Sequence, residues 1–474
     1  MLLLYHFTGV MGYTRNMDKQ NVAAKRRYSV LDYAIIGSLL VVFGGVVLHA
    51  PLSVWLSTMW PQHELLIKSW KEIILGLAFL LTVVKLTTAK RWGLVRNKYM
   101  GAIALFAALN AALVPFSLAK NGGSGGGEGA AIAAGILINL RFLLFFALVF
   151  VAIRLYPRLV KPFVIVFTVG AVIVVGFAVL QLTVLPVDAL KAIGYSESTI
   201  MPYLTVDQNP NYVRINSTLR GPNPLGLYAA IVVTLVLAIW FRVRRPFRLG
   251  EKIGLWLLGG GAVVTLWASY SRSAVLAMLV AVACILFAVY GKRLHRKVWL
   301  GLAILVVVLG GSLYAFRDSQ FVSQVVLHED PLEGNSVNSN EGHISSLVDG
   351  VRRLVTQPLG GGIGSTGSAS LLGNSPLIIE NQYLFVAHEN GWPGLALFLA
   401  ISYFVLAETW RRRRSWLALG VFASGAGIMV AGLFLPVWTD DTISIVWWGL
   451  AAVAVAMTTQ TPMRAQKLGR RGTA

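Results

Sequence analysis

The chain has 474 residues, of which 56% are hydrophobic and only 13% are charged, and its mean hydropathy is +0.68. Soluble domains are about a quarter charged and less than about half apolar, so this composition excludes an ordinary soluble protein. The formal net charge is +21, but the basic residues stand in short clusters between apolar runs, which favours a membrane protein over a nucleic-acid-binding one. The single cysteine, Cys284, excludes a disulfide framework and a cysteine-based metal site.

Apolar runs long enough to cross a bilayer recur along the whole chain. A membrane-spanning helix needs roughly 20 apolar residues, because the hydrocarbon holds no water to satisfy its backbone. The sequence therefore predicts an all-α integral membrane protein of about twelve transmembrane helices. We expect the spans near residues 31–50, 72–88, 99–119, 130–154, 163–186, 223–241, 253–270, 272–290, 298–315, 391–408, 416–435 and 442–459.

Basic residues predict how the spans are oriented. One side of the predicted membrane holds 29 of the 41 Lys and Arg, and by the positive-inside rule that side, with both termini, is cytoplasmic. The long loops at 187–222 and 316–390 then face outward, and we expect the chemistry there, since loops on a rigid scaffold usually carry function. The predicted organisation is a cytoplasmic extension (1–30), a twelve-helix domain (31–460) and a basic cytoplasmic tail (461–474).

Arginines at membrane depth or on the outward side indicate an anion site. Arg141 lies inside an apolar run, where a charge is costly unless it has a function or an ion-pair partner, and Lys85, in another run, is expected to snorkel. Arg214 and Arg220 lie just before a span, and Arg272 lies at the junction SYSRS between two spans. Guanidinium forks beside helix N termini suit phosphate oxygens. The alternative is that each arginine is a solvated loop charge.

The large outward loop supplies candidate bases. The segment EGHISSLVDGVRRLV is predicted to form an amphipathic helix that carries His343, and a turn rich in Pro and Gly follows it. Glu380 then begins the segment that leads into the tenth span, with His388 and Glu389 further along. A carboxylate or imidazole here could remove a proton from an attacking hydroxyl. The alternative is a helix cap with ordinary polar surface residues.

Four motifs, in this order along the chain, resemble the bacterial O-antigen ligase and polymerase family. They are RINSTLRGPNPLG (214–226), SYSRSA (269–274), PLGGGIGS (358–365) and ENQYLFVAHENGWPG (380–394). The resemblance covers about residues 70–460 and implies a fold of the membrane glycosyltransferase (GT-C-like) type. It also implies transfer of a glycan from undecaprenyl pyrophosphate to an acceptor hydroxyl at the outer face of the plasma membrane, with inversion and without a metal ion or cofactor. The acceptor would be a glycan, a lipid or a wall polymer.

The resemblance also implies which residues hold the donor. Family arginines that grip the pyrophosphate match Arg214 and Arg272, with Arg141 matched less closely. Arg220 and Asn223 lie in the same motif as Arg214, and we include them in the predicted site. Fixed cations suit this reaction because negative charge grows on the leaving pyrophosphate in the transition state.

The general base is where this chain departs from the family pattern. The family has a histidine followed by asparagine where this chain has Glu380 and Asn381, and that histidine is the proposed base. Glutamate can do the same work in an apolar environment. We therefore predict Glu380 as the base, with His343 and His388 as alternatives and Asn381 in a supporting role. The departure argues against transfer to lipid A core, because the acceptor side is where the pattern differs, and the sequence does not distinguish a ligase from a polymerase.

A transporter or flippase of a lipid-linked saccharide or an anion is the competing hypothesis. It predicts broken helices at the midplane and comparable functional loops on both sides, whereas the expected cytoplasmic connections here are short and basic. A purely structural scaffold would leave the arginines unexplained. The segment GGSGGGEG (122–129) is expected to be a flexible linker, because it lacks the strand and the lysine of a phosphate-binding loop.

Overall fold

The computed structural model describes residues 28–120, 126–206, 209–291 and 339–457, except that the side chains of residues 126 and 339–344 are not described. Within these ranges the longer helices are α3 (Val30–Gly45), α4 (His49–Met59), α5 (Glu64–Lys68), α6 (Trp70–Thr88), α7 (Lys98–Lys120), α8 (Gly126–Leu155), α9 (Val160–Thr183), α10 (Pro222–Arg242), α11 (Leu249–Ala268), α12 (Arg272–Tyr290), α14 (Ser339–Thr356), α15 (Gly367–Ser370), α16 (Gln382–Arg411), α17 (Trp416–Ala431) and α18 (Asp441–Ala456). Short 3-10 helices are η1 (Val46–Leu48), η2 (Pro61–His63), η3 (Trp92–Val95), η4 (Pro157–Leu159), η5 (Ala189–Ile193) and η7 (Val437–Thr439). Strands β1 (Tyr203–Val206) and β2 (Asn209–Ile215) pair antiparallel.

The helices agree with the spans expected from the sequence. In the part of the chain that the structure describes, eight helices are long and apolar enough to cross a membrane, which makes this a multi-pass membrane protein. Eleven of the predicted spans overlap a helix. The predicted span at 298–315 lies outside the described residues, so the count of twelve stays a prediction.

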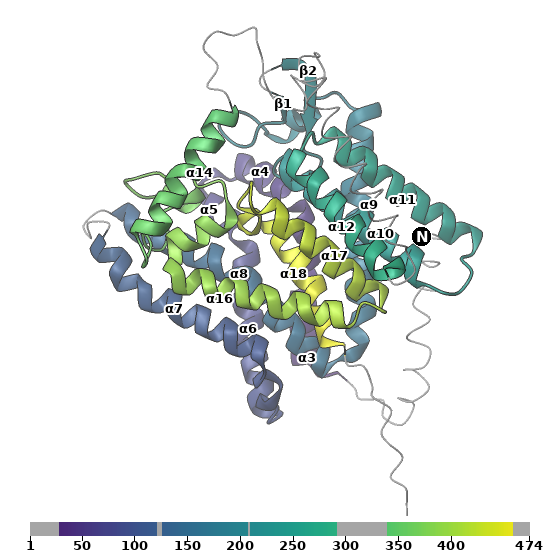
Figure 1. The fold of residues 1–474 in the computed structure, drawn as a ribbon, viewed down its shortest axis with the longest axis horizontal. Helices are drawn as coiled ribbons and strands as arrows, with labels where there is room; N and C mark the ends of the chain where they lie inside the picture. Colours follow the sequence, from purple (N-terminus) through teal and green to yellow (C-terminus); the bar gives the residue numbers. More distant parts are fainter. Residues whose placement is uncertain (1–27, 121–125, 207–208, 292–338, 458–474) are drawn as a thin grey trace, which may run out of the picture.

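Helix α18 is enclosed by the rest of the bundle. Every residue from Thr442 to Ala456 is buried, and Figure 1 shows this helix in the middle of the molecule. With 16 residues it is about 24 Å long, shorter than the roughly 30 Å of a hydrocarbon core. A helix that is apolar on all sides suits this position, because protein rather than lipid surrounds it.

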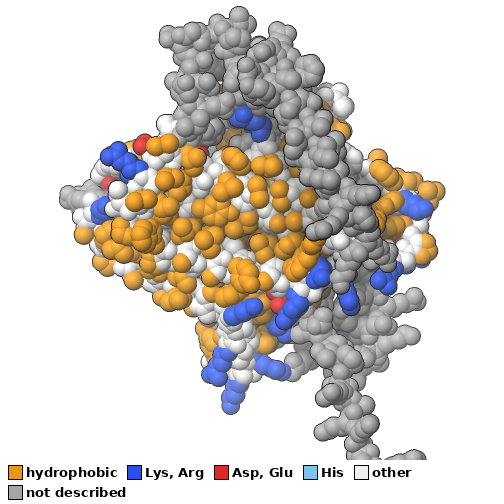
Figure 2. Space-filling model, in the orientation of Figure 1, with side chains coloured by type: hydrophobic (Ala, Val, Ile, Leu, Met, Phe, Trp, Pro, Cys, Tyr) orange, Lys and Arg blue, Asp and Glu red, His pale blue; other side chains and the backbone are white. Residues whose placement is uncertain are grey.

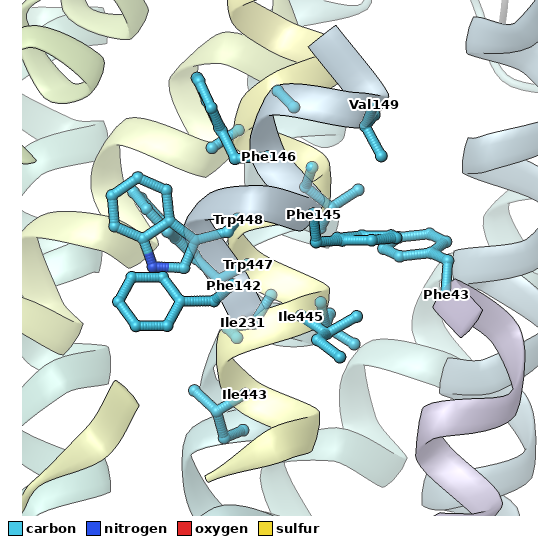
Figure 3. Close-up of a cluster of buried hydrophobic side chains, with 14 of the residues drawn as sticks. Phe43, Phe142, Phe145, Phe146, Val149, Ile231, Ile443, Ile445, Trp447 and Trp448 are labelled. Atoms are coloured by element: carbon cyan, nitrogen blue, oxygen red, sulfur yellow. The ribbon is translucent and has the colours of Figure 1, made fainter. Parts of the chain in front are cut away.

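Aromatic side chains fasten α8 to α18 and to α3 (Figure 3). The ring centroids of Phe142 and Trp448 lie 5.3 Å apart, and Phe145 stacks on Phe43 at 6.1 Å. Such aromatic pairs add about 0.5–1.5 kcal/mol each beyond their buried area. Arg141 precedes Phe142 on α8, so this packing fixes the arginine close to the start of α18.

Polar elements gather at one end of the bundle, where Figure 1 shows the β1–β2 hairpin (203–215) and α14. We name this the hairpin end. Both elements belong to the loops expected to face outward, although their side of the membrane stays a prediction. Figure 2 shows a broad hydrophobic area across the middle of one face, with Lys and Arg side chains above and below it. This is the surface expected of a protein that contacts lipid around its middle.

The glycine-rich segment at 122–129 is only in part a linker. Helix α8 already begins at Gly126, and Glu128 is buried, with its carboxylate accepting a hydrogen bond from the Asn374 backbone N–H at 3.2 Å. A Cβ on Gly127 would lie 2.5 Å from the Leu372 carbonyl oxygen, so glycine allows this close approach. The expected flexible linker is therefore wrong for residues 126–129, while 121–125 lie outside the described residues.

Candidate active site

Strand β2 places Arg214 against the turn between α11 and α12. The Nε of Arg214 donates to the Ser269 carbonyl oxygen at 3.0 Å, and a terminal nitrogen donates to Asn223 Oδ1 at 2.8 Å. Tyr212, two residues earlier on the same face of the strand, packs its ring against Tyr270, with centroids 6.3 Å apart. One guanidinium thus joins the hairpin to the first turn of α10 and to the α11–α12 turn.

Arg272 begins α12 and is exposed beside the same turn. It follows Ser269 by three residues, so their α-carbons are at most about 11 Å apart, and Arg214 and Arg272 lie beside the same turn. Ser271 at the start of α12 and Gly221 at the start of α10 make no side-chain capping hydrogen bond. Two helix N termini with their partial positive charge therefore lie beside the arginines.

The turn that joins the two arginines is tight and strained. Tyr270 has a φ of 47°, a conformation that non-glycine residues rarely adopt and that costs about 1–3 kcal/mol. Gly226 allows α10 to approach the turn, since a Cβ at this position would lie 2.6 Å from Ser269 Oγ. Strain of this kind is common at functional sites, where the surrounding structure holds it in place.

Arg220 and Arg141 both lie near the start of α18. Arg220 is exposed, and its positive charge, like that of Arg141, acts on Asp440. Asp440 caps α18 by accepting a hydrogen bond from the Ile443 backbone N–H at 3.0 Å. Burial raises the pKa of Asp440, while the two arginines oppose this rise.

Arg141 belongs to a buried ion-pair network. Its Nη1 lies 3.7 Å from Glu72 Oε1, and its Nη2 contacts Asp441. Lys71 pairs with the same Asp441 at 2.8 Å, and His49 Nε2 lies 3.3 Å from it. The five groups come from α4, α6, α8 and α18. The sequence allows Arg141 either a function or an ion-pair partner, and these contacts show the ion pair. Its role in pyrophosphate binding stays a prediction.

Lys85 is also paired. Its Nζ lies 2.5 Å from Asp32 Oδ1, and Tyr156 donates a hydrogen bond to the same carboxylate. The ion pair, which was the alternative to snorkelling, is therefore present, and whether the Lys85 ammonium also reaches the membrane surface stays a prediction.

Asn381 fixes the start of α16. Its Oδ1 accepts hydrogen bonds from the backbone N–H groups of Tyr383 and Leu384 at 2.9 and 3.0 Å, and its Nδ2 donates to the Leu433 carbonyl oxygen at 2.8 Å. Helix α16 is thereby tied to the end of α17. Glu380, half-buried, immediately precedes this cap. Its position is therefore well defined, and its role as the base stays a prediction.

The two candidate histidines lie on different helices. His343 falls in α14, but its side chain lies outside the described side chains. His388 is buried in α16 and faces residues 358–367, which we name the glycine loop. A Cβ on Gly361 would lie 2.3 Å from His388 Nε2, so only glycine allows the imidazole this close to the loop.

Helix α16 is broken where the glycine loop meets it. Gly391 has φ 66° and ψ −173°, which no helix contains. The Gly361 N–H donates to the His388 carbonyl oxygen at 2.6 Å, and the Trp392 N–H donates to the Pro358 carbonyl oxygen at 2.9 Å. The glycine loop thus supplies hydrogen-bond partners for the backbone N–H and C=O groups that lose their helical partners at the break. Non-helical backbone at membrane depth needs such partners. The transporter hypothesis predicts broken helices, but these groups are occupied by the chain's own loop.

Glu389 is a buried carboxylate. The sequence places this residue near the start of the tenth span but predicts neither its burial nor its partners. It is 0% exposed. Its Oε2 accepts a hydrogen bond from Asn139 Nδ2 at 3.0 Å, and its Oε1 accepts one from the Thr366 N–H at 3.3 Å. Asn139 also donates to Asn110 at 3.3 Å. Glu389 therefore ties the glycine loop to α8 and α7. Its partner Asn139 is 250 residues away in the chain, so no local sequence pattern indicates this contact.

Together, the helices define a multi-pass membrane protein in which Arg214 contacts the α11–α12 turn that leads to Arg272. Residues 253–399 match the family model described as O-antigen ligase, and this match confirms the family resemblance of the sequence. It includes SYSRSA, the glycine loop and ENQYLFVAHENGWPG, whereas Arg141 and the motif of Arg214 lie before it. The family implies a membrane glycosyltransferase-like enzyme with a lipid-linked glycan donor. No curated protein matches the chain at a significant level.

Proposed function

We propose that this protein transfers a glycan from an undecaprenyl-pyrophosphate carrier to an acceptor hydroxyl at the outer face of the plasma membrane. The observation that best supports this function is the position of Arg214, which contacts Asn223 in the first turn of α10 and the Ser269 carbonyl oxygen in the turn that leads to Arg272 at the start of α12. Guanidinium groups bind phosphate oxygens through paired hydrogen bonds, and helix N termini favour anions. Both would bind the departing pyrophosphate more strongly as its negative charge grows.

The helices beside this site suit a polyprenyl chain. Exposed apolar side chains continue from the α11–α12 turn along both helices, and they include Trp267, Val263, Trp256 and Leu279. Trp267 also packs against Tyr270 in the turn itself, with ring centroids 6.3 Å apart. In the proposed complex the carrier lipid lies along this surface while its pyrophosphate reaches the arginines.

Glu380 is the base in this proposal. It takes the proton from the acceptor hydroxyl, whose oxygen attacks the anomeric carbon as the bond from that carbon to the pyrophosphate oxygen breaks. Attack from the face opposite the leaving group inverts the anomeric configuration. No metal ion or cofactor takes part, and His343 and His388 remain the alternatives for the base. The hairpin end faces away from the cytoplasm, as the basic loops predict.

Purified protein in proteoliposomes, supplied with an undecaprenyl-pyrophosphate-linked glycan and candidate acceptors, tests this function. We expect undecaprenyl pyrophosphate to be released as a glycosidic bond of inverted configuration forms. NMR of the product measures that configuration. A retained configuration would contradict the single displacement. Movement of an intact lipid-linked glycan across the bilayer, without cleavage, would favour the transporter.

A further inference from the structure

A second group of basic side chains surrounds the glycine loop, on helices other than those that carry Arg214 and Arg272. Lys120 ends α7, Arg353 lies in the last turns of α14, and His388 lies in α16. Lys120 Nζ donates to the Gly360 carbonyl oxygen at 2.8 Å. The positive charges of Lys120 and Arg353 both act on His388, and that of Arg353 acts on Lys120. The Gln357 N–H donates to the Arg353 carbonyl oxygen and the Gly360 N–H donates to the Gln357 carbonyl oxygen, each at 2.8 Å, so all three basic residues adjoin the glycine loop.

This basic group has no acidic partner in the part of the chain that the structure describes. Among the described residues, none of Lys120, Arg353 and His388 forms an ion pair with a carboxylate. Glu389, the next residue after His388, accepts its hydrogen bonds from Asn139 and Thr366 instead. The positive charges of Lys120 and Arg353 repel one another, so an anion bound beside both would be stabilised, and a neutral His388 could still donate or accept a hydrogen bond there.

His388 supplies a second, independent sign of a ligand. Its side chain is 6% exposed, and its Nδ1 is buried without a hydrogen-bond partner among the described residues. A buried polar atom without a hydrogen-bond partner is unfavourable, and a ligand could supply that partner. Lys120 is exposed, Arg353 is half-buried and His388 is buried. The basic group thus runs from the surface into the protein, as a site that admits a ligand from outside requires.

An unpaired apolar stripe runs along the helix that carries Arg353. Leu347, Val351 and Val355 follow one another at four-residue intervals and so share a face of α14, and they are 45%, 46% and 68% exposed. The helix packs on α16 through another face, where the Leu354 carbonyl oxygen accepts a hydrogen bond from Trp392 Nε1 at 2.7 Å. A helix with an exposed apolar stripe beside basic residues is suited to the membrane interface.

We propose that Lys120, Arg353 and His388 bind the phosphate head group of a membrane amphiphile, whose alkyl chain lies along the exposed stripe of α14. The charge of the head group complements the basic cluster, and the stripe gives the alkyl chain an apolar surface. A free phosphate ion shares the head-group chemistry but would leave the stripe uncovered. The proposal concerns binding alone, and it holds whether or not the protein transfers a glycan.

Binding of dodecyl phosphate to purified protein in detergent, measured by native mass spectrometry or calorimetry, tests the proposal. The measurement is made in an Arg272→Gln background, so that the site beside the α11–α12 turn contributes little. We expect the added pair Lys120→Gln and Arg353→Gln to weaken binding at least 10-fold. Arg352→Gln, which removes the same charge from the neighbouring exposed position, is the matched control and should change binding less than 2-fold.

Three results would overturn the proposal. The first is unchanged dodecyl phosphate binding in the Lys120→Gln and Arg353→Gln protein. The second is an equal loss in the Arg352→Gln control, which would show a general charge effect. The third is inorganic phosphate binding as tightly as dodecyl phosphate, which would leave no role for the alkyl chain. If the paired variant does not fold, Lys120→Gln alone, at an exposed position, should still weaken binding several-fold.

Discussion

The Nε of Arg214 donates a hydrogen bond to the carbonyl oxygen of Ser269 at 3.0 Å, and this contact joins the β hairpin to the turn that precedes Arg272. The two partners are 55 residues apart in the chain. Because Ser269 closes α11 and Arg272 opens α12, this contact places Arg214 beside the turn from which Arg272 extends. The backbone of the proposed donor site is therefore tied to the hairpin at this turn.

Replacing Arg272 with Lys should impair glycan transfer although the charge is kept. A lysine ammonium is a point charge and cannot form the paired hydrogen bonds of a guanidinium. Removing one such donor to a developing anion typically lowers the rate about 10²–10³-fold, and we expect a loss of that order in the proteoliposome assay. Lys252→Gln, at the other end of α11, should leave the rate close to normal. Normal transfer by the Arg272→Lys protein would contradict the proposed role.

The network around Arg141 offers a test of whether this residue is structural or binds the donor. Asp441→Leu leaves Arg141 and Lys71 without their shared partner, and breaking a buried pair costs about 3–5 kcal/mol. Adding Arg141→Met should recover much of the lost stability, because an apolar pair can replace a buried ion pair. Thermal unfolding of the purified proteins measures this.

Glycan transfer by the same double variant then decides the role of Arg141. If the folded Arg141→Met and Asp441→Leu protein transfers glycan at the normal rate, the prediction that Arg141 binds pyrophosphate is wrong. If the protein is stable but inactive, the prediction gains support. Carrier binding should be measured as well, since a lost donor ligand would weaken it.

The spans were predictable because length and apolarity are local properties of a sequence. The α11–α12 junction was predictable for the same reason, since SYSRS leaves only residues 269–271 between two helices. The family motifs predicted that Arg214 and Arg272 act together, and the hairpin contact to Ser269 brings them to one turn. Binding of a pyrophosphate by Arg214 and Arg272 stays a prediction.

Other features depend on residues that are far apart in the sequence. Arg141 pairs with Glu72 and Asp441, and nothing local to Arg141 indicates either partner. Glycine-rich composition predicted a linker before α8, but the contact of Glu128 with Asn374 extends the helix into it. Local propensity is a weak predictor where such tertiary contacts compete with it.

Gly391→Ala should destabilise the protein, because this residue breaks α16 with a φ of 66°. Forcing a non-glycine residue into such a conformation costs about 1–3 kcal/mol. A Cβ there would also lie 2.6 Å from the Pro358 carbonyl oxygen, and overpacking adds roughly 1–3 kcal/mol. Gly37→Ala, on α3 with nothing within 4 Å of its Cβ position, is the matched control. Equal unfolding temperatures for the two variants would show that the glycine loop does not hold the break.

The orientation of the bundle can be tested with cysteines in a Cys284→Ala background. Ser198→Cys lies in the exposed loop that follows η5, and it should react with a membrane-impermeant thiol reagent in intact cells. Arg244→Cys, in the exposed basic connection between α10 and α11, should react only after the cells are permeabilised. The opposite pattern of labelling would reverse the predicted topology and place the arginine site on the cytoplasmic side.

The last prediction concerns the base. Glu380→Gln keeps the size and polarity of the side chain but removes its ability to accept a proton, and general-base assistance typically contributes about 10²–10⁴-fold to a rate. We expect transfer to fall by that amount. Carrier binding should stay nearly normal, because the proposed pyrophosphate ligands lie on β2 and α12. The cap at the start of α16 should be kept, because Asn381 makes it.

His343→Ala and His388→Ala separate Glu380 from the alternative bases. If Glu380→Gln transfers glycan at a normal rate and His343→Ala is inactive, the base is His343. The same comparison with His388→Ala needs one more control, because His388 packs on Gly361 of the glycine loop and its loss can disturb the fold. An inactive His388→Ala protein with an unchanged unfolding temperature and a normal Glu380→Gln rate would assign the base to His388. A large loss confined to Glu380→Gln would support the carboxylate.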